Sequence, residues 1–85
     1  MAVVIPSKAA KQVRKSGMPD DDWEDLRRRL ERIARDPFAS HPDVKRLTDG
    51  SFRVRHGIWR AIYIVTDAGD VEVITAGHRR EVFGR

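Results

Sequence analysis

Apolar and polar positions follow a helical period in the first half of the chain and a two-residue period in the second half. At the start, an apolar run at 2–5 stops at Pro6, and the segment 8–15 follows with Ser7 placed as a helix N-cap. The pattern predicts a short strand and then a short helix, which Gly17 ends.

A second helix is predicted to begin at Pro19, with three acidic residues at 20–22 near the positive end of the helix dipole. One apolar stripe recurs at helical spacing and consists of Trp23, Leu26, Leu30, Ile33 and Ala34. The arginines of this helix fall largely off the stripe, which favours a solvated face. Asp36-Pro37 ends the helix, and 38–48 is predicted to be a loop.

From Ser51 onward the period is 2, which is typical of strands. In the strand predicted at 52–56, Phe52, Val54 and His56 point to one face, and Arg53 and Arg55 point to the other. The segment 58–65 is apolar on both faces and is predicted to be a central strand. A turn at 67–70 then joins it to a returning strand at 71–76.

These elements predict an α+β fold. It has an N-terminal strand and a two-helix hairpin packed on a mainly antiparallel sheet, which ends in a three-stranded meander. At 85 residues the chain is expected to be a single domain, 1–85, with a thin core. There is no cysteine, and the N-terminus has neither a signal peptide nor a membrane span, so we expect a cytoplasmic protein.

Basic residues outnumber acidic ones, 17 to 13, and the formal net charge of +4 indicates anionic partners. The distribution is more informative than the sum. The stretch 50–66 has no acid and carries four basic side chains: Arg53, Arg55, His56 and Arg60. Arg53 and Arg55 lie two residues apart on one strand, with Cα atoms roughly 6.6 Å apart, which suits a run of phosphates.

Arg60 is unusual because it lies in an otherwise apolar strand. A charge there costs desolvation unless it is paired or reaches an anionic site. An ion pair with Asp70 or Glu72 on the neighbouring strand is the alternative to a phosphate site.

The available polar chemistry is that of guanidinium and imidazole. His41, His56 and His78 are not at metal-ligand spacing, so we expect neither a metal nor another cofactor. Arginine stabilises the added negative charge of a phosphoryl transition state, whereas histidine moves protons near neutral pH. Arginine itself is a poor base because its pKa lies above ~12.

Several spaced motifs resemble the RelE/ParE toxin superfamily. In order they are Lys45-Arg46-Leu47, then Asp49 to Arg55 with its R-x-R strand, then Gly57-Ile58-Trp59-Arg60-Ala61-Ile62-Tyr63, and finally Gly77-His78-Arg79-Arg80-Glu81-Val82-Phe83. The match is close in the C-terminal half. In the N-terminal half it rests on element order and on the Asp-Pro after the second helix.

The resemblance implies a toxin held by a cognate antitoxin protein. RelE-like members cut mRNA on the ribosome and so inhibit translation, whereas ParE-like members poison DNA gyrase. The resemblance therefore predicts an endoribonuclease, with a gyrase inhibitor or a degenerate toxin that only binds its antitoxin as the alternatives.

The resemblance also implies site residues. Arg53, Arg55 and Arg60 match positions that bind the scissile phosphate, with Lys45 in the lead-in and His78 and Arg79 lining the same cleft. We expect His78 to act as general base or acid, and His56 to be a weaker candidate because it alternates to the opposite face. Gly77 is predicted to close the last strand.

Phe83 departs from the family pattern, which commonly has a tyrosine that takes part in proton transfer. Phenylalanine stacks on a base but has no hydroxyl. Its alternative role is that of a core residue that pins the tail to the sheet.

Overall fold

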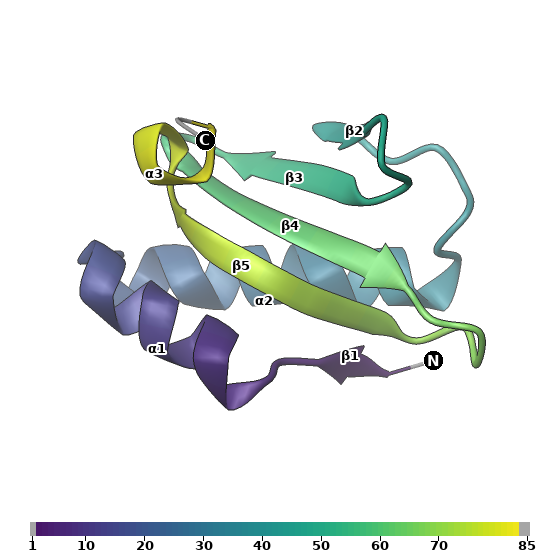
Figure 1. The fold of residues 1–85 in the computed structure, drawn as a ribbon, viewed down its shortest axis with the longest axis horizontal. Helices are drawn as coiled ribbons and strands as arrows, with labels where there is room; N and C mark the ends of the chain where they lie inside the picture. Colours follow the sequence, from purple (N-terminus) through teal and green to yellow (C-terminus); the bar gives the residue numbers. More distant parts are fainter. Residues whose placement is uncertain (1, 84–85) are drawn as a thin grey trace.

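The computed structural model describes residues 2–83 and confirms the α+β fold (Figure 1). The elements, in chain order, are β1 (Val3–Val4), α1 (Ser7–Ser16), α2 (Asp20–Arg35), β2 (Val44–Arg46), β3 (Phe52–His56), β4 (Trp59–Val65), β5 (Val71–His78) and α3 (Arg79–Phe83). Both predicted helices and the predicted meander of β3, β4 and β5 are present.

The five strands form one mixed sheet in the order β1-β5-β4-β3-β2. β1 runs parallel to β5, and the other neighbouring strands are antiparallel. β4 is the middle strand, as its apolar residues on both faces predicted. The tight β3–β4 turn uses Gly57 at φ 60°, a left-handed conformation that glycine adopts at little cost.

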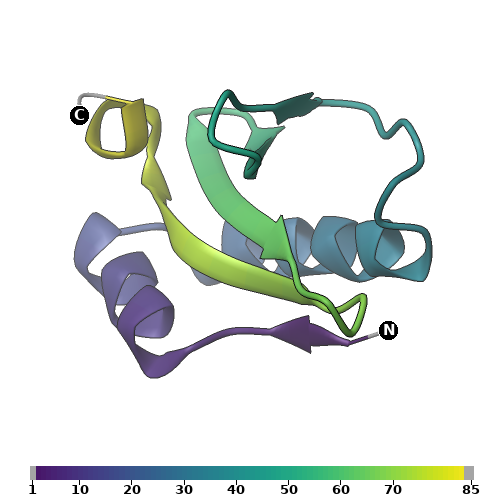
Figure 2. The same cartoon turned by 45° about the vertical axis from the view of Figure 1, so that its right-hand side comes forward.

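Both long helices contribute to one core on a single face of the sheet. Figures 1 and 2 show α2 running behind the curved sheet and α1 lying near its β1–β5 edge. Ala9 and Val13 of α1 and Leu26 and Leu30 of α2 are buried in the same cluster as Val54 of β3. Other core residues from the sheet are Ala61, Tyr63, Val71, Val73 and Ala76. We call this side of the sheet the helix face.

The predicted loop at 38–48 is wrong in part, because it contains the edge strand β2. Val44, Lys45 and Arg46 pair with Val54, Arg53 and Phe52 of β3. Two of the three β2 residues are exposed and charged, so the segment has no apolar alternation of its own. Its strand conformation depends on hydrogen bonding to β3, which a local pattern does not reveal.

The start of α1 is a second correction. Ser7 is the first helical residue, and Pro6 occupies the N-cap position without a side-chain hydrogen bond. The Pro6 carbonyl already accepts the hydrogen bond of Ala10 N at 3.0 Å, so the helix begins one residue earlier than a serine cap implies. The predicted stop at Gly17 is confirmed, with φ at 76°.

The C-terminal segment also differs from the prediction. β5 continues to His78, so Gly77 lies inside the strand, opposite Arg60, and does not close it. The chain then turns directly into α3. This helix begins at the end of β5, beside the β3–β4 turn, where the Arg79 backbone N–H donates to the Ile58 carbonyl at 2.8 Å.

Candidate nucleic-acid interface

The sheet register places the strand arginines on one face, opposite to the helix face. Arg55 lies directly across from Arg60, and Arg53 lies across from Lys45 on its other side. Residues opposite each other on paired strands point to the same side, whereas Val54 and Ala61 between them point into the core. We call the side that carries Lys45, Arg53, Arg55 and Arg60 the arginine face.

Arg60 is the buried member of this group, with only 8% of its surface exposed. Its Nη1 donates to the carbonyl oxygens of Gly57 and Trp59, at 2.5 and 2.9 Å, so it braces the β3–β4 turn. Burial lowers the pKa of Arg60 most, and the nearby charges of Arg55, Arg53 and Arg79 lower it further. Arg60 thus has a structural role in addition to its place among like charges.

The register does not favour the alternative ion pair for Arg60. Glu72 lies opposite Ile64, four residues along β4 from Arg60, which corresponds to roughly 13 Å. The carboxylate of Asp70 accepts a hydrogen bond from Ala2 N at 2.9 Å at the other end of the sheet.

Arg79 joins the strand arginines from α3. Its side chain is exposed, and its charge is among those that lower the pKa of Arg60. Because its backbone N–H is anchored to Ile58, the position of the first residue of α3 is fixed relative to the β3–β4 turn. The charges of Arg53, Arg55 and Arg79 all act on Arg60, so the four arginines lie near one another at this end of the sheet.

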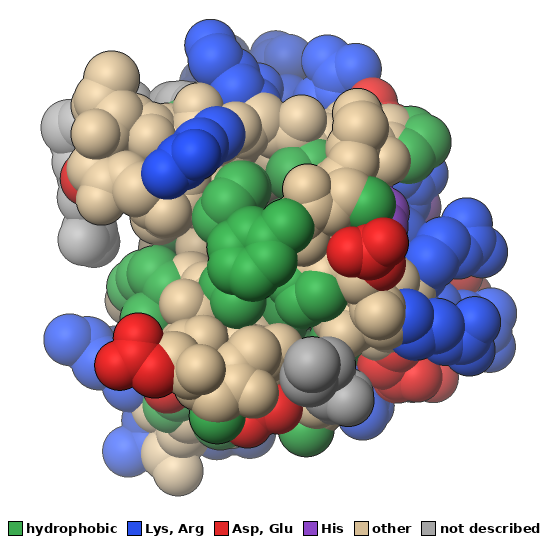
Figure 3. Space-filling view, turned by 90° about the vertical axis from the view of Figure 1, so that its right-hand side faces the viewer, with side chains coloured by type: hydrophobic (Ala, Val, Ile, Leu, Met, Phe, Trp, Pro, Cys, Tyr) green, Lys and Arg blue, Asp and Glu red, His purple; other side chains and the backbone are tan. Residues whose placement is uncertain are grey.

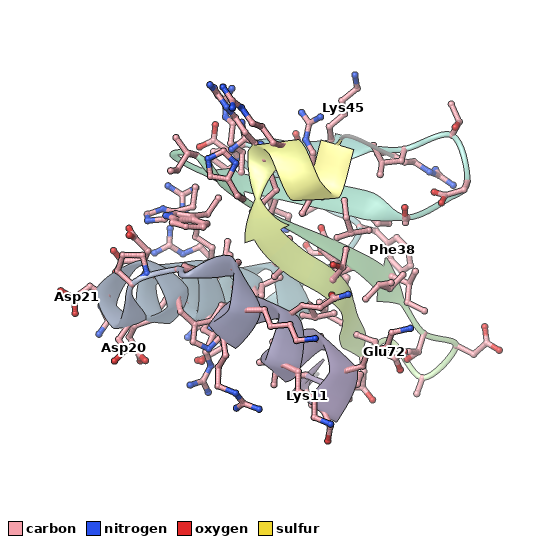
Figure 4. All side chains as sticks on the ribbon, turned by 60° about the vertical axis from the view of Figure 1, so that its left-hand side comes forward. Lys11, Asp20, Asp21, Phe38, Lys45 and Glu72 are labelled. Carbon is pink, nitrogen blue, oxygen red and sulfur yellow. The ribbon has the colours of Figure 1, made fainter. Side chains whose placement is uncertain are left out.

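Lys45 lies at the margin of this group. It is exposed on the edge strand, and Figure 4 shows it projecting into solvent on the opposite side of the molecule from Lys11 of α1. Lys45 is therefore placed to contact a chain that extends beyond the arginines.

His56 lies away from the arginine face, as its alternation predicted. It shares the helix face with Val54, and its Nε2 lies 3.3 Å from Asp22 Oδ1 and 3.9 Å from Asp25 Oδ2 of α2. This contact ties the first turns of α2 to the end of β3, which accounts for the residue structurally.

His78 is not brought onto the arginine face by the register, contrary to the expectation of a shared cleft. It lies opposite Trp59, one residue beyond Gly77, and its ring meets the Trp59 ring edge-on with centroids 5.7 Å apart. Its Nδ1 accepts a hydrogen bond from the Arg80 backbone N–H at 3.1 Å. The neutral imidazole therefore carries its proton on Nε2, which is the nitrogen left for a substrate.

Two further expectations concern Phe83 and metals. Phe83 is the last residue of α3, but its side chain lies outside the described part of the structure. Within the described residues, no group of three or more His, Asp or Glu side chains is arranged to hold a metal ion.

Asp43, which the sequence analysis did not single out, contacts the arginine group and connects it to Arg29. The Asp43 carboxylate bonds to Arg55 Nη2 through Oδ1 at 2.9 Å and to Arg29 Nη1 of α2 through Oδ2 at 3.2 Å. These hydrogen bonds, first from Arg55 and then from Arg29, lower the pKa of Asp43. The signal in the sequence was weak, because the partners are 12 and 14 residues away and Asp43 falls in a predicted loop.

A cavity of about 420 Å³ opens on the helix face beside α2. Its lining includes Arg28, Arg32, His41, Val54 and His56. It shares Asp43 and Arg29 with the network described above, but Arg53, Arg60 and Arg79 are not part of its wall.

Apolar surface is exposed at the end of the molecule where the β4–β5 turn lies. Figure 3 shows apolar side chains at the centre of this end, with both basic and acidic side chains around them. Phe38, in the loop after α2, is 78% exposed, and Figure 4 places it on the far side from Asp20 and Asp21. No helix in the described part of the chain is long and apolar enough to cross a bilayer.

Solved structures of toxin–antitoxin complexes have the same fold. A similar chain occurs in the RelBE2 complex of Mycobacterium tuberculosis, with a TM-score of 0.70 and 22% identity over 92% of this chain and 96% of that one. Another occurs in the RelB–RelE complex of Methanococcus jannaschii, with a TM-score of 0.73 and 13% identity over 94% of each chain. The intact RelBE complex of E. coli contains a third, with a TM-score of 0.62 and 23% identity over 91% of this chain and 99% of that one. No curated protein sequence matches the chain.

The family profile described as the ParE toxin of the type II toxin–antitoxin system, parDE, matches residues 4–83. The chain therefore belongs to this family, within the RelE/ParE superfamily, and is a toxin of a type II toxin–antitoxin system.

Proposed function

We propose that this toxin is an endoribonuclease that cleaves mRNA on the ribosome and so inhibits translation. The observation that carries the proposal is the gathering of four arginines at one end of the sheet, with the buried Arg60 among them. Like charges repel, so such a group is stabilised when a polyanion binds. Single-stranded RNA supplies that charge through its run of phosphates, which positively charged protein surfaces bind along the backbone.

The chemistry that fits this site is transfer of a phosphate within the RNA chain. The 2′-oxygen forms a bond to the adjacent phosphorus, the bond from phosphorus to the 5′-oxygen breaks, and a proton moves from the 2′-hydroxyl to the leaving 5′-oxygen. Arg53, Arg55, Arg60 and Arg79 stabilise the extra charge on the phosphorane, which is commonly the largest contribution to such catalysis.

The proton-transfer role of His78 stays a prediction. Its Nε2–H suits donation to the leaving oxygen, but the register gives it weaker support than the arginines have. A Gln at this position keeps a hydrogen-bond donor but does not titrate. His78→Gln should therefore flatten the alkaline limb of a pH–rate profile if protonated His78 donates the proton, because a general acid is lost as pH rises.

We propose a cognate antitoxin as the protein partner, acting in the cytoplasm. The similar chains come from toxin–antitoxin complexes, and the exposed apolar patch, together with the net charge of +4, suits an acidic, amphipathic segment.

Sequencing the 5′ ends of cellular RNA after induction tests the ribonuclease directly. We expect new ends within translated messages for the wild type and their loss in Arg79→Gln, which leaves the backbone anchor of α3 intact. Arg14→Gln on α1 is the matched control, since it removes the same charge from another exposed helix position and should cut normally. Arg60→Gln is less informative alone, because Arg60 also braces the β3–β4 turn.

The second candidate is inhibition of DNA gyrase without catalysis. It is favoured by the match to the ParE profile and by phenylalanine in place of tyrosine at position 83. Early DNA breakage with an SOS response and unbroken mRNA would select it. Early loss of translation with intact DNA would eliminate it, and gain of cleavage in Phe83→Tyr would mark a weakened ribonuclease.

A further inference from the structure

Asp43 has an unusual backbone conformation. Among the described residues it is the one non-glycine residue with a positive φ, at 62°. Aspartate tolerates this left-handed region better than most residues, but it still costs more there than glycine. An aspartate at such a position indicates that its carboxylate has a role that glycine could not fill.

The contacts of Asp43 converge on Arg55. Its carbonyl oxygen accepts the Arg55 backbone N–H at 3.0 Å, and its carboxylate accepts the Arg55 guanidinium at 2.9 Å. One residue thus holds both the main chain and the charged end of a long, flexible side chain. The second carboxylate oxygen reaches Arg29 of α2 at 3.2 Å, which ties Asp43 in turn to the helix.

The ion pair with Asp43 matters for Arg55 because the neighbouring side chains carry the same charge. It lies directly opposite Arg60 and belongs to the group of like charges that includes Arg53 and Arg79. With 55% of its side chain exposed, Arg55 is able to swing into solvent and away from this repulsion. The Asp43 carboxylate, with 32% of its side chain exposed, supplies the opposite charge that keeps Arg55 at the sheet.

We propose that Asp43 is a positioning residue that fixes the Arg55 guanidinium on the arginine face, where it meets an RNA phosphate. The inference rests on the proposed function for its phosphate, but the hold on Arg55 is a property of the free protein. Arg29 is the anchor of the carboxylate and not a contact of the RNA.

Cleavage kinetics on ribosome-bound mRNA test the role. In Asp43→Asn the turnover number should fall about tenfold, because misplacing one group at a reacting phosphate is costly. KM should stay the same or fall, since a negative charge beside the phosphate has been removed. Asp43→Gly should change the turnover number and KM in the same way, because glycine keeps the left-handed backbone conformation but lacks the carboxylate. A rise in KM with an unchanged turnover number in both variants would overturn the proposal.

A double-mutant cycle separates positioning from direct action. In an Arg55→Gln background, Asp43→Asn should reduce the turnover number less than twofold, because there is no guanidinium left to position. A full further tenfold loss would mean that Asp43 acts on the RNA itself. Arg28→Gln is the matched control, because it removes an exposed arginine of α2 that pairs with Asp25 and not with Asp43, and it should leave the turnover number within twofold.

Side-chain NMR tests the hold without any reaction. In the purified toxin the heteronuclear NOE of Arg55 Nε should drop in Asp43→Asn, with that of Arg14 unchanged. An Arg55 value equal to the wild type would contradict the inference. If the wild type cuts no RNA, the proposed function fails, whereas this measurement still decides whether Asp43 orders Arg55.

Discussion

The two faces of the sheet are built from alternate residues of the same strands, yet they obey opposite rules. On the helix face, Val54 and Ala61 are fully buried and pack with apolar residues of both helices. On the arginine face, Arg55 and Arg60 lie across from each other and repel. The first face is optimised for stability, whereas the second gathers like charges, which a bound anion would stabilise further. This difference is the reason why we propose the arginine face as the functional surface.

The largest effect should come from the helix face. Leu30 is fully buried in the core, and Leu30→Ala is expected to reduce the free energy of unfolding by about 2–5 kcal/mol. Urea denaturation measures the loss. The exposed Arg28→Ala on the same helix should change it by less than about 0.5 kcal/mol, and an equal loss in both would break the comparison.

On the arginine face, the expected effect is on RNA affinity and its salt dependence. With four arginines on phosphates, the logarithm of the binding constant for single-stranded RNA should fall with log salt at a slope of roughly −3. Arg53→Gln should reduce the slope by about 0.7, and Arg14→Gln should leave it unchanged. Fluorescence anisotropy gives both values, and identical slopes for all three proteins would refute phosphate contact by Arg53.

The pKa of the Tyr63 hydroxyl tests whether water is excluded from the core. Its ring stacks on Phe52, and its hydroxyl has no hydrogen-bond partner among the described residues. Burial raises its pKa from 10.0 to about 12. As the chain has one tyrosine, phenolate absorbance should report this value directly, and titration near 10 would contradict the burial.

The same shift predicts a loss of stability at high pH. A raised pKa in the folded state stabilises below 10.0, and this contribution disappears as pH rises toward about 12. Tyr63→Phe should lack that decline and, at pH 7, be neutral to about 1 kcal/mol more stable in urea, since no hydrogen bond is lost.

The smallest expected effect is the contribution of Asp43 to thermal stability, which should depend on pH. Its lowered pKa means that its ion pairs stabilise the fold above the ordinary value of 3.8 and are lost as pH falls below it. The thermal midpoint of Asp43→Asn should therefore be lower than that of the wild type at pH 7, and the gap should close in acid. A gap that persists unchanged at pH ~2 would contradict the stabilising role of these ion pairs.

The fold was largely predictable because its main elements carry their own patterns. The 58–65 segment is apolar on both faces and indeed forms the middle strand. The stripe of α2 faces the core where the period placed it, with Trp23 partly buried and the other four residues buried. β2 was missed because Val44–Arg46 is short and charged and gains its conformation from β3.

The candidate site was predictable where it depends on strand alternation and on motif residues. Arg53, Arg55, Arg60 and Arg79 do converge, and His56 does lie on the other face. The register of β5 carries His78 away from Arg60, and the bonds of Asp43 to Arg55 and Arg29 cross between distant segments. Such long-range pairings leave no periodic signal in a single sequence.

The most direct test of the two-face account is an NMR titration of the purified toxin with a short single-stranded RNA whose 2′-hydroxyls are methylated against cleavage. Shifts should concentrate on the Nε–H signals of Arg53, Arg55, Arg60 and Arg79, while His56 and the exposed arginines of α2 that lack a bond to Asp43, such as Arg28, stay unchanged. Shifts centred on α2, or none at all, would contradict the assignment of nucleic-acid binding to the arginine face.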